Sequence, residues 1–473
     1  MEFNLFEDFP TVSKKDWIQL ATKDLKGKDF EQTLVSETLD GIKIFPFYTK
    51  EDLNFTAGLL PYQHQINPNP GIPGISRRYW SNIISANGKE EKLINKELIM
   101  ALQQGADAIY LQMEGNENLD LLLKDIVLPY IKIYIGPKSN KPYEIIRKFI
   151  EWVKIQNIAT EELHGGIIWD GIGACLIEKN DLLNIAVEVK GLMDLLSPFP
   201  NFCAISIGSS QYHDAGATMV QELAYSLAGY IELLERLYDM GIEWESIFKK
   251  TLLHASAGSQ FFEELCKLRA FKILFHQLAQ LYNVKLDPEK IPLFTETSRW
   301  TKSRWDIHTN MLRNTSEAMS ALLGGSHALW VRPHIEPLGI GNDFSKRMAL
   351  NISNILKEES YLDKVLDPVA GSFFLENLTL SIFEKVKSEL EQIELQGGWW
   401  KLYVSNIIQE KVKDSRLIRQ NKVLRGETTK IGVNKFPGDT EEIRSPEKVI
   451  EESWQLLPSW ETFLFEKENS KKS

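Results

Sequence analysis

The feature that most constrains the fold is a regular alternation of short apolar runs with long amphipathic segments between residues 79 and 331. The short runs have the length and composition of buried strands; they are 79–85, 107–113, 130–136, 166–170, 202–208, 254–261, 291–295 and 326–331. The segments between them carry apolar residues at helical spacing; they are 89–104, 143–156, 181–196, 215–240, 262–282 and 307–323. Strands that alternate with helices favour a parallel sheet, and this many units match the size of a (β/α)8, or TIM, barrel. The sequence therefore predicts an α/β fold built on a TIM barrel.

The residues before this region have a looser pattern. They contain a helical pattern around Trp17, a strand-like run at 41–46 and a Pro/Asn/Gly-rich stretch at 66–74, where prolines block regular structure. We expect residues 1–75 to form an extended N-terminal arm.

The residues after the last strand predict a short C-terminal extension. Helical patterns cover 343–358 and 376–396, and Gly397-Gly398 stops the second one. The stretch 425–447 is charged and punctuated by Gly and Pro, so it is predicted to be a linker, and a short helical pattern follows at 448–457. We therefore divide the chain into an arm (1–75), a barrel (76–400), and a C-terminal helix, linker and tail (401–473).

Composition excludes several classes of function. The chain carries 54 Lys and Arg against 65 Asp and Glu, so no basic excess exists to displace counterions and we expect no nucleic-acid partner. No apolar run approaches the roughly 18 residues of a membrane span, and the N-terminus lacks a secretory pattern. Cys175, Cys203 and Cys266 are far apart and outside zinc-binding spacing. We therefore expect reduced thiols, no metal site, no membrane contact and a cytoplasmic location.

The loop at 209–214 is the richest in reactive side chains among the expected strand ends, where TIM barrels carry their chemistry. Two interpretations of this loop fit. In the first, His213 is a general acid and Asp214 its orienting carboxylate. In the second, Asp214 caps a helix that begins near Ala215, and His213 merely lines the loop. The spacing favours capping but leaves both interpretations open.

A series of short motifs extends over most of the chain. They are I-F-P-F-Y-T at 44–49, P-G-I-P-G at 70–74, I-S-I at 205–207 followed by D-A-G-A-T at 214–218, K-L-R-A at 267–270, L-G-G-S at 323–326, D-P-V-A-G-S-F-F at 367–374 and G-V-N-K-F at 432–436. On these motifs and their order the chain resembles the methylmalonyl-CoA mutase family, whose members use adenosylcobalamin. The resemblance implies a TIM barrel from an isomerase that rearranges the carbon skeleton of acyl-CoA thioesters by radical chemistry.

The chain departs from this family where catalytic members contact their substrate. Their pattern I-S-I-S-G-Y-H-x-x-E-A-G-A-T turns Tyr and His toward the substrate, but here Ser210 and Gln211 match those positions and His213 falls two places later. Ile168 replaces a substrate-binding Gln, which leaves polar substrate atoms unpaired at about 1–3 kcal/mol each. Loss of a general acid forfeits roughly 10²–10⁴-fold in rate. The resemblance therefore implies a pseudoenzyme barrel without catalytic residues, with His213 as a weak fallback.

Three matches to the family, Asp170, Arg269 and Glu336, are candidate vestiges of cofactor or CoA contacts. We favour structural roles for them, with Asp170 as a buried hydrogen-bond acceptor and Arg269 in a salt bridge. Cobalamin-binding members carry an Asp-x-His-x-x-Gly motif whose His becomes a cobalt ligand, and no such motif occurs here. We therefore expect no cofactor on this chain and adenosylcobalamin on a partner subunit.

The resemblance implies that this chain is the small, non-catalytic subunit of a heterodimeric mutase. Its partner would be the large catalytic subunit, which isomerises methylmalonyl-CoA to succinyl-CoA, and the isolated chain is expected to be capable of self-association. In the family the arm wraps the neighbouring subunit. We expect Trp17, Phe45, Phe47 and Tyr48 to be its interface anchors, because an arm of this kind cannot bury them alone.

Two alternatives stay open. The first is an active mutase barrel that takes cobalamin from a separate chain, with His213 in place of the missing His. The second is a free-standing CoA-ester binder. Long side chains at Tyr212, Arg304 and Trp305 are expected to plug the barrel mouth, and a cavity for a CoA thioester at the strand ends would refute that expectation.

Overall fold

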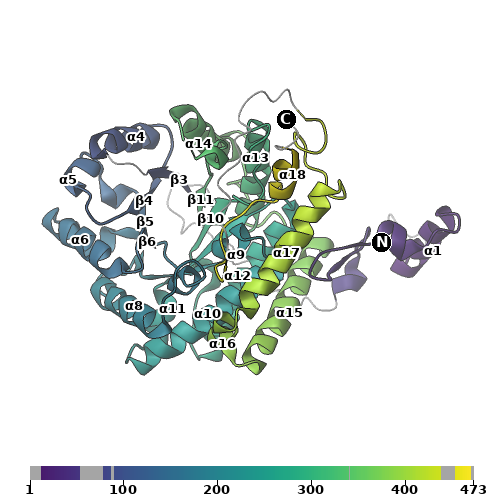
Figure 1. Cartoon of the computed structure of the whole chain (residues 1–473), viewed down its shortest axis with the longest axis horizontal. Helices are drawn as coiled ribbons and strands as arrows, with labels where there is room; N and C mark the ends of the chain where they lie inside the picture. The colour runs from purple at the N-terminus through teal and green to yellow at the C-terminus, as the bar shows by residue number, and fades with distance from the viewer. Residues whose placement is uncertain (1–11, 54–77, 87–89, 340, 438–452, 470–473) are drawn as a thin grey trace, which may run out of the picture.

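The computed structural model describes residues 12–53, 78–86, 90–339, 341–437 and 453–469 (Figure 1). At its centre lies a parallel sheet in the order β7-β6-β5-β4-β3-β11-β10-β9-β8. Its strands are β3 (Ser81–Ala86), β4 (Ala108–Met113), β5 (Lys132–Pro137), β6 (His164–Ile167), β7 (Phe202–Cys203), β8 (Ile205–Gly208), β9 (Thr251–Ala257), β10 (Leu293–Thr297) and β11 (Ala328–Trp330). Because only Ala204 separates β7 from β8, the ends of the sheet meet and close a barrel. The predicted TIM barrel is confirmed.

Helices between successive strands form the outer layer of the barrel (Figure 1). They are α4 (Glu91–Gln103), α5 (Leu119–Leu122), α6 (Pro142–Ile155), α7 (Gly171–Ala174), α8 (Leu182–Leu196), α9 (Ser210–Asp214), α10 (Met219–Asp239), α11 (Trp244–Lys249), α12 (Phe261–Leu281), α13 (Thr309–Leu323) and, after β11, α14 (Asp343–Glu358). Side-chain caps fix where several of the long helices begin, among them α8 and α10. Asp181 accepts a hydrogen bond at the start of α8, and Thr218 forms a capping box with Gln221 at the start of α10.

Two elements differ in position from their predictions. The strand predicted at 254–261 is β9, which begins at Thr251 because Thr251–Leu253 are buried beside β8 and β10, and it ends before Gly258. The helix predicted at 215–240 begins only at Met219. Gly216 lies between α9 and α10 with φ at +94°, a conformation that interrupts a helix and favours glycine.

Two apolar cores lie on the two sides of the sheet. The larger one is shared by the strands and the outer helices. The smaller one fills the barrel interior with Ile83, Ala108, Tyr110, Tyr134, Ile168, Leu252, Phe294, Ala328 and Trp330. The ring of Phe294 lies 5.7 Å from that of Tyr110 and 5.0 Å from that of Tyr134, and the Tyr110 ring lies 5.2 Å from Trp330. These edge-to-face contacts form an aromatic layer across the barrel.

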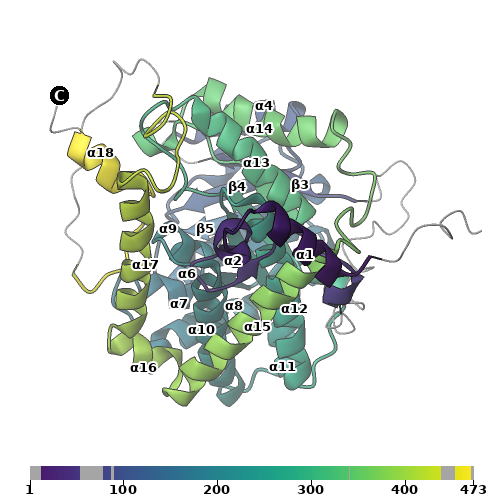
Figure 2. The same ribbon diagram turned by 90° about the vertical axis from the view of Figure 1, so that its right-hand side faces the viewer.

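A further helical layer covers the outside of α10 and α12 (Figure 2). It consists of α15 (Phe373–Leu395), α16 (Gly398–Val404) and α17 (Ile407–Leu424). Gly397, at φ +102°, ends α15 as predicted, and α16 begins directly at Gly398. The described tail, 453–469, ends in α18 (Phe463–Asn469), beside α17. Residues 453–457 are not helical, whereas the rest of the helical pattern at 448–457 and the stretch at 66–74 lie outside the described residues.

The N-terminal arm projects from the side of the barrel (Figures 1 and 2). It comprises α1 (Lys14–Asp24), α2 (Phe30–Leu34), a hairpin of β1 (Ser36–Glu37) with β2 (Lys43–Ile44), and a 3₁₀ turn at Lys50–Leu53. Its second half is attached to α15, where the Tyr48 ring lies 5.2 Å from Phe374. No residue of α1 or α2 is buried, and Trp17 stacks on Phe47, at 4.8 Å, and meets the edge of Phe30.

Candidate functional site at the two ends of the barrel

His213 lies at the carboxyl end of the strands, on α9, but it does not face open space. Its Nδ1 lies 2.7 Å from Oε1 of Glu222 and its Nε2 lies 2.7 Å from Oγ of Ser298, and only 1% of its surface is exposed. Burial alone would lower the pKa of His213, but the Glu222 carboxylate outweighs it and the pKa is raised. The orienting carboxylate is therefore Glu222 rather than the neighbouring Asp214.

The Ser298–His213–Glu222 connectivity is that of a catalytic triad, yet its surroundings are structural. Ser298 is fully buried. Glu222 is shared with Lys267, whose Nζ lies 2.7 Å from Glu222 and 2.6 Å from Glu264. These charges compensate one another inside the fold. The arrangement joins α9, α10, α12 and the loop after β10.

Asp214 does not cap a helix. The residue that caps α10 is Thr218, four positions later, and the Asp214 backbone carbonyl instead accepts a hydrogen bond from the amide of Ser459 in the tail, at 2.7 Å. Burial raises the pKa of the Asp214 carboxyl, although Arg332 works in the opposite direction. The sequence offered two roles for Asp214, as the carboxylate that orients His213 and as a helix cap. The Asp214 side chain has neither role in the structure.

Ser210 and Gln211, which match the family's Tyr and His positions, turn in different directions. Ser210 Oγ lies 3.2 Å from Nε2 of His254, at the barrel mouth. Gln211 donates from Nε2 to the Leu456 carbonyl in the tail, at 3.3 Å. Ile168, the replacement for the substrate-binding Gln, belongs to the apolar filling of the barrel.

The barrel mouth holds a buried network of charged side chains that was not predicted from the sequence. Glu296 lies 2.9 Å from Arg332 and 3.5 Å from His254, and Arg332 lies 2.5 Å from Glu336. Burial would raise the pKa of Glu296, but Arg332 and His254 outweigh it and the pKa is strongly lowered. The strand-end positions of Glu296 and Arg332 are visible in the sequence, whereas their pairing is not. Each charge has an opposite partner, and Arg332 and Glu336 also line a pocket of 430 Å³ at this end of the barrel.

The three candidate vestiges have protein partners. Asp170 accepts hydrogen bonds from the amides of Ile172 and Gly208, at 3.0 and 3.2 Å, and burial raises its pKa to about 6. Arg269 pairs with Asp367 at 2.6 Å and with Glu376 at 3.5 Å, on α12 and away from the mouth. Glu336 pairs with Arg332, as above. Contact of any of them with a ligand stays a prediction.

The three side chains predicted to plug the mouth lie elsewhere. The Tyr212 hydroxyl accepts a hydrogen bond from Nε1 of Trp399, at 2.9 Å, among the outer helices. Arg304 stacks on Trp460 of the tail, and Trp305 packs edge-to-face against Phe465 of the tail. The barrel is instead filled by the aromatic layer, whose members alternate inward along the strands.

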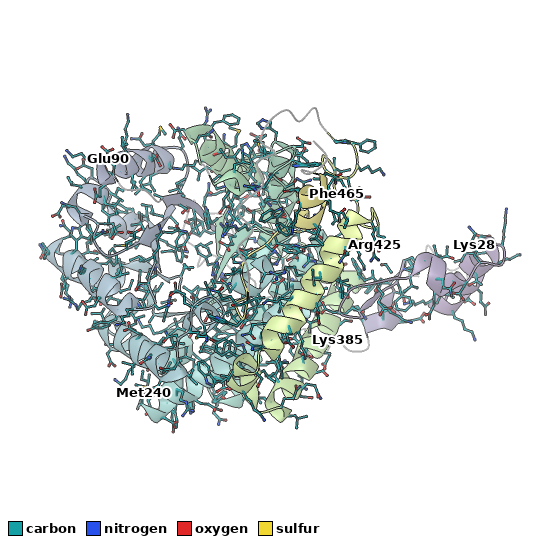
Figure 3. All side chains as sticks on the ribbon, in the orientation of Figure 1. Lys28, Glu90, Met240, Lys385, Arg425 and Phe465 are labelled. Carbon is teal, nitrogen blue, oxygen red and sulfur yellow. The ribbon has the colours of Figure 1, made fainter. Side chains whose placement is uncertain are left out.

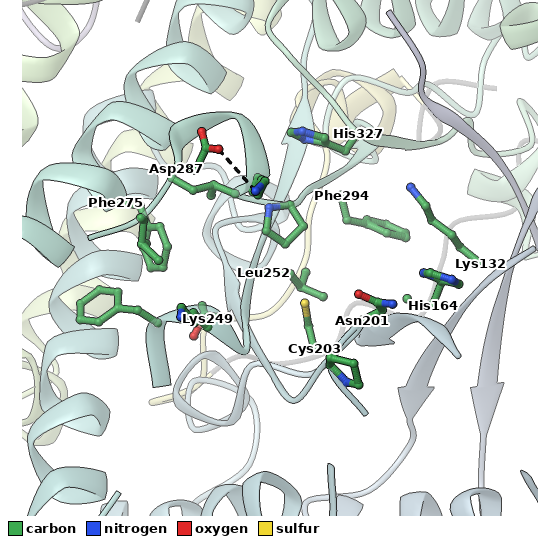
Figure 4. Close-up of a pocket in the computed structure, with 18 of the residues that line it drawn as sticks. Lys132, His164, Asn201, Cys203, Lys249, Leu252, Phe275, Asp287, Phe294 and His327 are labelled. Carbon is green, nitrogen blue, oxygen red and sulfur yellow. Dashed lines mark ion pairs between the residues drawn. The ribbon is translucent and has the colours of Figure 1, made fainter. Parts of the chain in front are cut away.

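The amino end of the barrel has a different character. A pocket of 620 Å³ opens there, and Phe294, Leu252 and Cys203 contribute barrel-interior side chains to its wall (Figure 4). Its basic lining consists of Lys132, Lys249, Lys285, Lys290, His164 and His327. Asp287 is the one carboxylate among the residues that line this pocket. The pocket is therefore positively charged and suited to an anionic group.

Several sequence expectations concern other sites. Cys175, Cys203 and Cys266 are free thiols. Within the described residues, no group of three or more His, Cys, Asp or Glu is arranged to hold a metal ion. None of the described helices combines the length and apolar character that crossing a membrane requires.

Comparison with known proteins places this geometry in a family. A model of the methylmalonyl-CoA mutase family matches residues 111–456. The methylmalonyl-CoA mutase small subunit of Porphyromonas gingivalis is 32% identical over 450 residues, covering 92% of this chain and 72% of that protein. The small subunit of Streptomyces virginiae is 26% identical over 93% of this chain and 72% of its own length. The methylmalonyl-CoA mutase of Cereibacter sphaeroides is 28% identical, and the chain spans 64% of its length.

These matches agree with the motifs, the barrel and the arm. The resemblance predicted from the sequence, including that to small subunits, is confirmed. The chain belongs to the methylmalonyl-CoA mutase family.

Proposed function

We propose that this chain is a non-catalytic subunit that supports a large catalytic subunit, which isomerises methylmalonyl-CoA to succinyl-CoA. The observation that carries the proposal is the aromatic layer of Tyr110, Tyr134, Phe294 and Trp330. Close-packed rings occupy the middle of the barrel, between the pockets at its two ends, and block a path for a thioester along the barrel axis. The barrel is a packed core rather than a substrate channel.

The polar groups at the mouth support the same proposal. Catalysis needs a proton donor or charge that strengthens its contacts in the transition state. His213 is enclosed between Glu222 and Ser298, and Glu296 is neutralised by Arg332. The side chains of His213 and Glu296 are therefore already engaged by partners within the protein. Adenosylcobalamin would accordingly be held by the partner, and both subunits would work in the cytoplasm.

The arm supports the assignment of a partner subunit. Helices α1 and α2 bury none of their residues within this chain, although they carry Trp17 and Phe30. Apolar surface of this kind gains about 25 cal/mol per Å² when a partner covers it. We infer that the large subunit packs against this part of the arm and forms a heterodimer.

Co-expression with the large subunit of a methylmalonyl-CoA mutase tests the proposal. We expect a stable complex of both chains, and adenosylcobalamin-dependent turnover whenever the large subunit is present. Trp17→Asp on α1 should weaken the complex strongly, because it removes a half-buried aromatic anchor. Leu281→Asp, at an exposed position at the end of α12, is the matched control and should leave the complex intact.

Turnover of methylmalonyl-CoA by this chain alone, supplied with adenosylcobalamin or an isolated cobalamin-binding domain, would overturn the proposal in favour of an active barrel. His213→Gln then decides the role of the histidine. It retains hydrogen-bonding capacity toward Glu222 and Ser298 but cannot serve as a general acid near neutral pH.

A second candidate function, binding of CoA esters, is favoured by the basic pocket at the amino end. Its lysines suit the phosphates of CoA. Titration calorimetry of the full chain with CoA thioesters tests this candidate. Micromolar binding that is lost in a Lys132→Met and Lys285→Glu double variant would support it, and the absence of measurable heat over several temperatures would remove it.

A further inference from the structure

The described tail crosses the carboxyl end of the barrel instead of leaving it. It bridges the segments that follow β6, β8 and β10 by backbone hydrogen bonds. These run from the amides of Leu456, Ser459 and Glu461 to the carbonyls of Leu176, Asp214 and Trp300, at 2.8, 2.7 and 2.9 Å respectively. Main-chain bonds to three different loops tie the tail to one fixed path.

Side chains anchor this path along its length. Leu456 is fully buried in the main apolar core. Glu461 forms a buried ion pair with Lys430. The Glu466 carboxylate, on α18, accepts hydrogen bonds from Oγ of Ser303 at 2.8 Å and from Nε1 of Trp460 at 3.0 Å. An apolar anchor and two buried carboxylates are more than a solvated terminus would carry.

Helix α17 holds the other edge of the tail. Gln420 donates from Nε2 to the Trp460 carbonyl at 2.9 Å, and Arg416 donates to the Leu457 carbonyl at 3.2 Å. Figure 2 shows α18 beside the end of α17. The tail is thus enclosed between α17 on one side and the strand-end loops on the other.

We propose that residues 453–469 act as an intramolecular lid that covers the segments after β6, β8 and β10, on one side of the carboxyl end of the barrel. The lid fixes the loop that carries Asp214 and Gln211, so that neither a ligand nor a domain of another chain reaches this loop until the lid is released. A partner must then dock on other surfaces while the lid is closed. The lid is a property of this chain alone and is tested without a partner.

The native cysteines provide the test. Cys175 is buried and directly precedes Leu176, whose carbonyl holds Leu456, whereas Cys266 is buried on α12 beside Leu375 of α15. Labelling of the full chain with an aromatic disulfide reagent should be slow at both thiols. Leu456→Asp, or a stop codon after residue 452, should accelerate labelling of Cys175 by about tenfold or more and leave Cys266 unchanged.

A matched control and a second measurement keep the test decisive. Leu417→Asp introduces the same charge on the outer face of α17, where Leu417 is 47% exposed, and should change neither rate. Unchanged labelling of Cys266 shows that the fold survives. In the unmodified chain, hydrogen exchange should show protected amides at Leu456, Ser459 and Glu461. Free-peptide exchange at these amides, or equal Cys175 labelling with and without the tail, would overturn the proposal.

Discussion

The two ends of the barrel are built on opposite principles. At the carboxyl end, charges such as Glu296 and Arg332 are buried and paired, and the tail crosses the segments that follow β6, β8 and β10. At the amino end, Lys285 and its neighbours line an open pocket with little opposing charge. The aromatic layer separates the two ends. TIM barrels carry their chemistry at the carboxyl end, which here holds paired charges beside a pocket of 430 Å³, whereas the charged residues that line the pocket at the amino end are basic apart from Asp287.

The largest effect should come from opening the layer between the ends. Phe294→Ala removes a buried ring that contacts Tyr110 and Tyr134, and the loss of transfer free energy plus the residual cavity should lower the free energy of unfolding by about 3–5 kcal/mol. Urea denaturation measures it. A decrease in the free energy of unfolding below about 1 kcal/mol would mean that the aromatic layer is poorly packed and does not separate the two ends of the barrel.

The next effect is a pH dependence at the carboxyl end. The pKa of Asp170 is raised to about 6 by burial, above its ordinary value of 3.8, so the folded state binds more protons than the unfolded state between these values. Its contribution to stability is therefore present at low pH and declines as the pH rises to about 6, by about 3 kcal/mol in total.

Asp170→Asn should remove this dependence. Its stability relative to the unmodified chain, measured by urea denaturation at several pH values, should improve steadily from pH 4 to pH 6 and then stay constant. A constant difference over this range would show that Asp170 is not enclosed at the barrel mouth.

The lid contributes a smaller effect of the opposite sign. Burial would raise the pKa of Glu461, but Lys430 and Arg419 outweigh it and the pKa is lowered. Its stabilisation is therefore complete above the unfolded pKa and is lost as the pH falls through the folded value. Glu461→Gln should cost about 1.5–3 kcal/mol at pH 7 and progressively less in acid. Thermal unfolding at pH 7 and at pH 3 distinguishes this result from a pH-independent packing defect.

The smallest effect is expected at the amino end. Lys285 is exposed at the rim of the pocket, so Lys285→Glu should change the free energy of unfolding by no more than about 0.5 kcal/mol. The same denaturation assay measures it. A larger loss would show that this end is as integrated into the fold as the other one, and the contrast between the ends would fail.

The sequence predicts the barrel well because its strands and helices have distinct periods. Even the displaced element, β9, is recognisable as an apolar run. The site is harder to predict, because His213 has two carboxylate neighbours in principle, Asp214 in sequence and Glu222 in space, and only the fold selects Glu222. Likewise, Tyr110 and Tyr134 are ordinary strand residues until barrel closure turns both toward Phe294.

The tail illustrates a second limit. Its apolar residues are as frequent as in the rest of the chain, and they are Trp454, Leu456, Leu457, Trp460, Phe463, Leu464 and Phe465. Its contacts join positions hundreds of residues apart, such as Leu456 with Leu176, and no local pattern encodes them. The helix cap at Thr218 was missed for a related reason, since Asp214 is an equally good capping residue and only the glycine at 216 decides between them.

The interruption of the sheet at Ala204 has a mechanical consequence. Strand β7 pairs only with β6, over two residues, and β8 only with β9, over four, so among the described strands no ladder crosses from β6 to β8. The barrel is thus one curved sheet whose two edges meet at a single seam, between β6 and β8. Across this seam the Oγ of Ser206 accepts a hydrogen bond from the amide of Trp169, and the Asp170 carboxylate accepts one from the amide of Gly208, so side chains hold the barrel shut where the backbone ladder is interrupted.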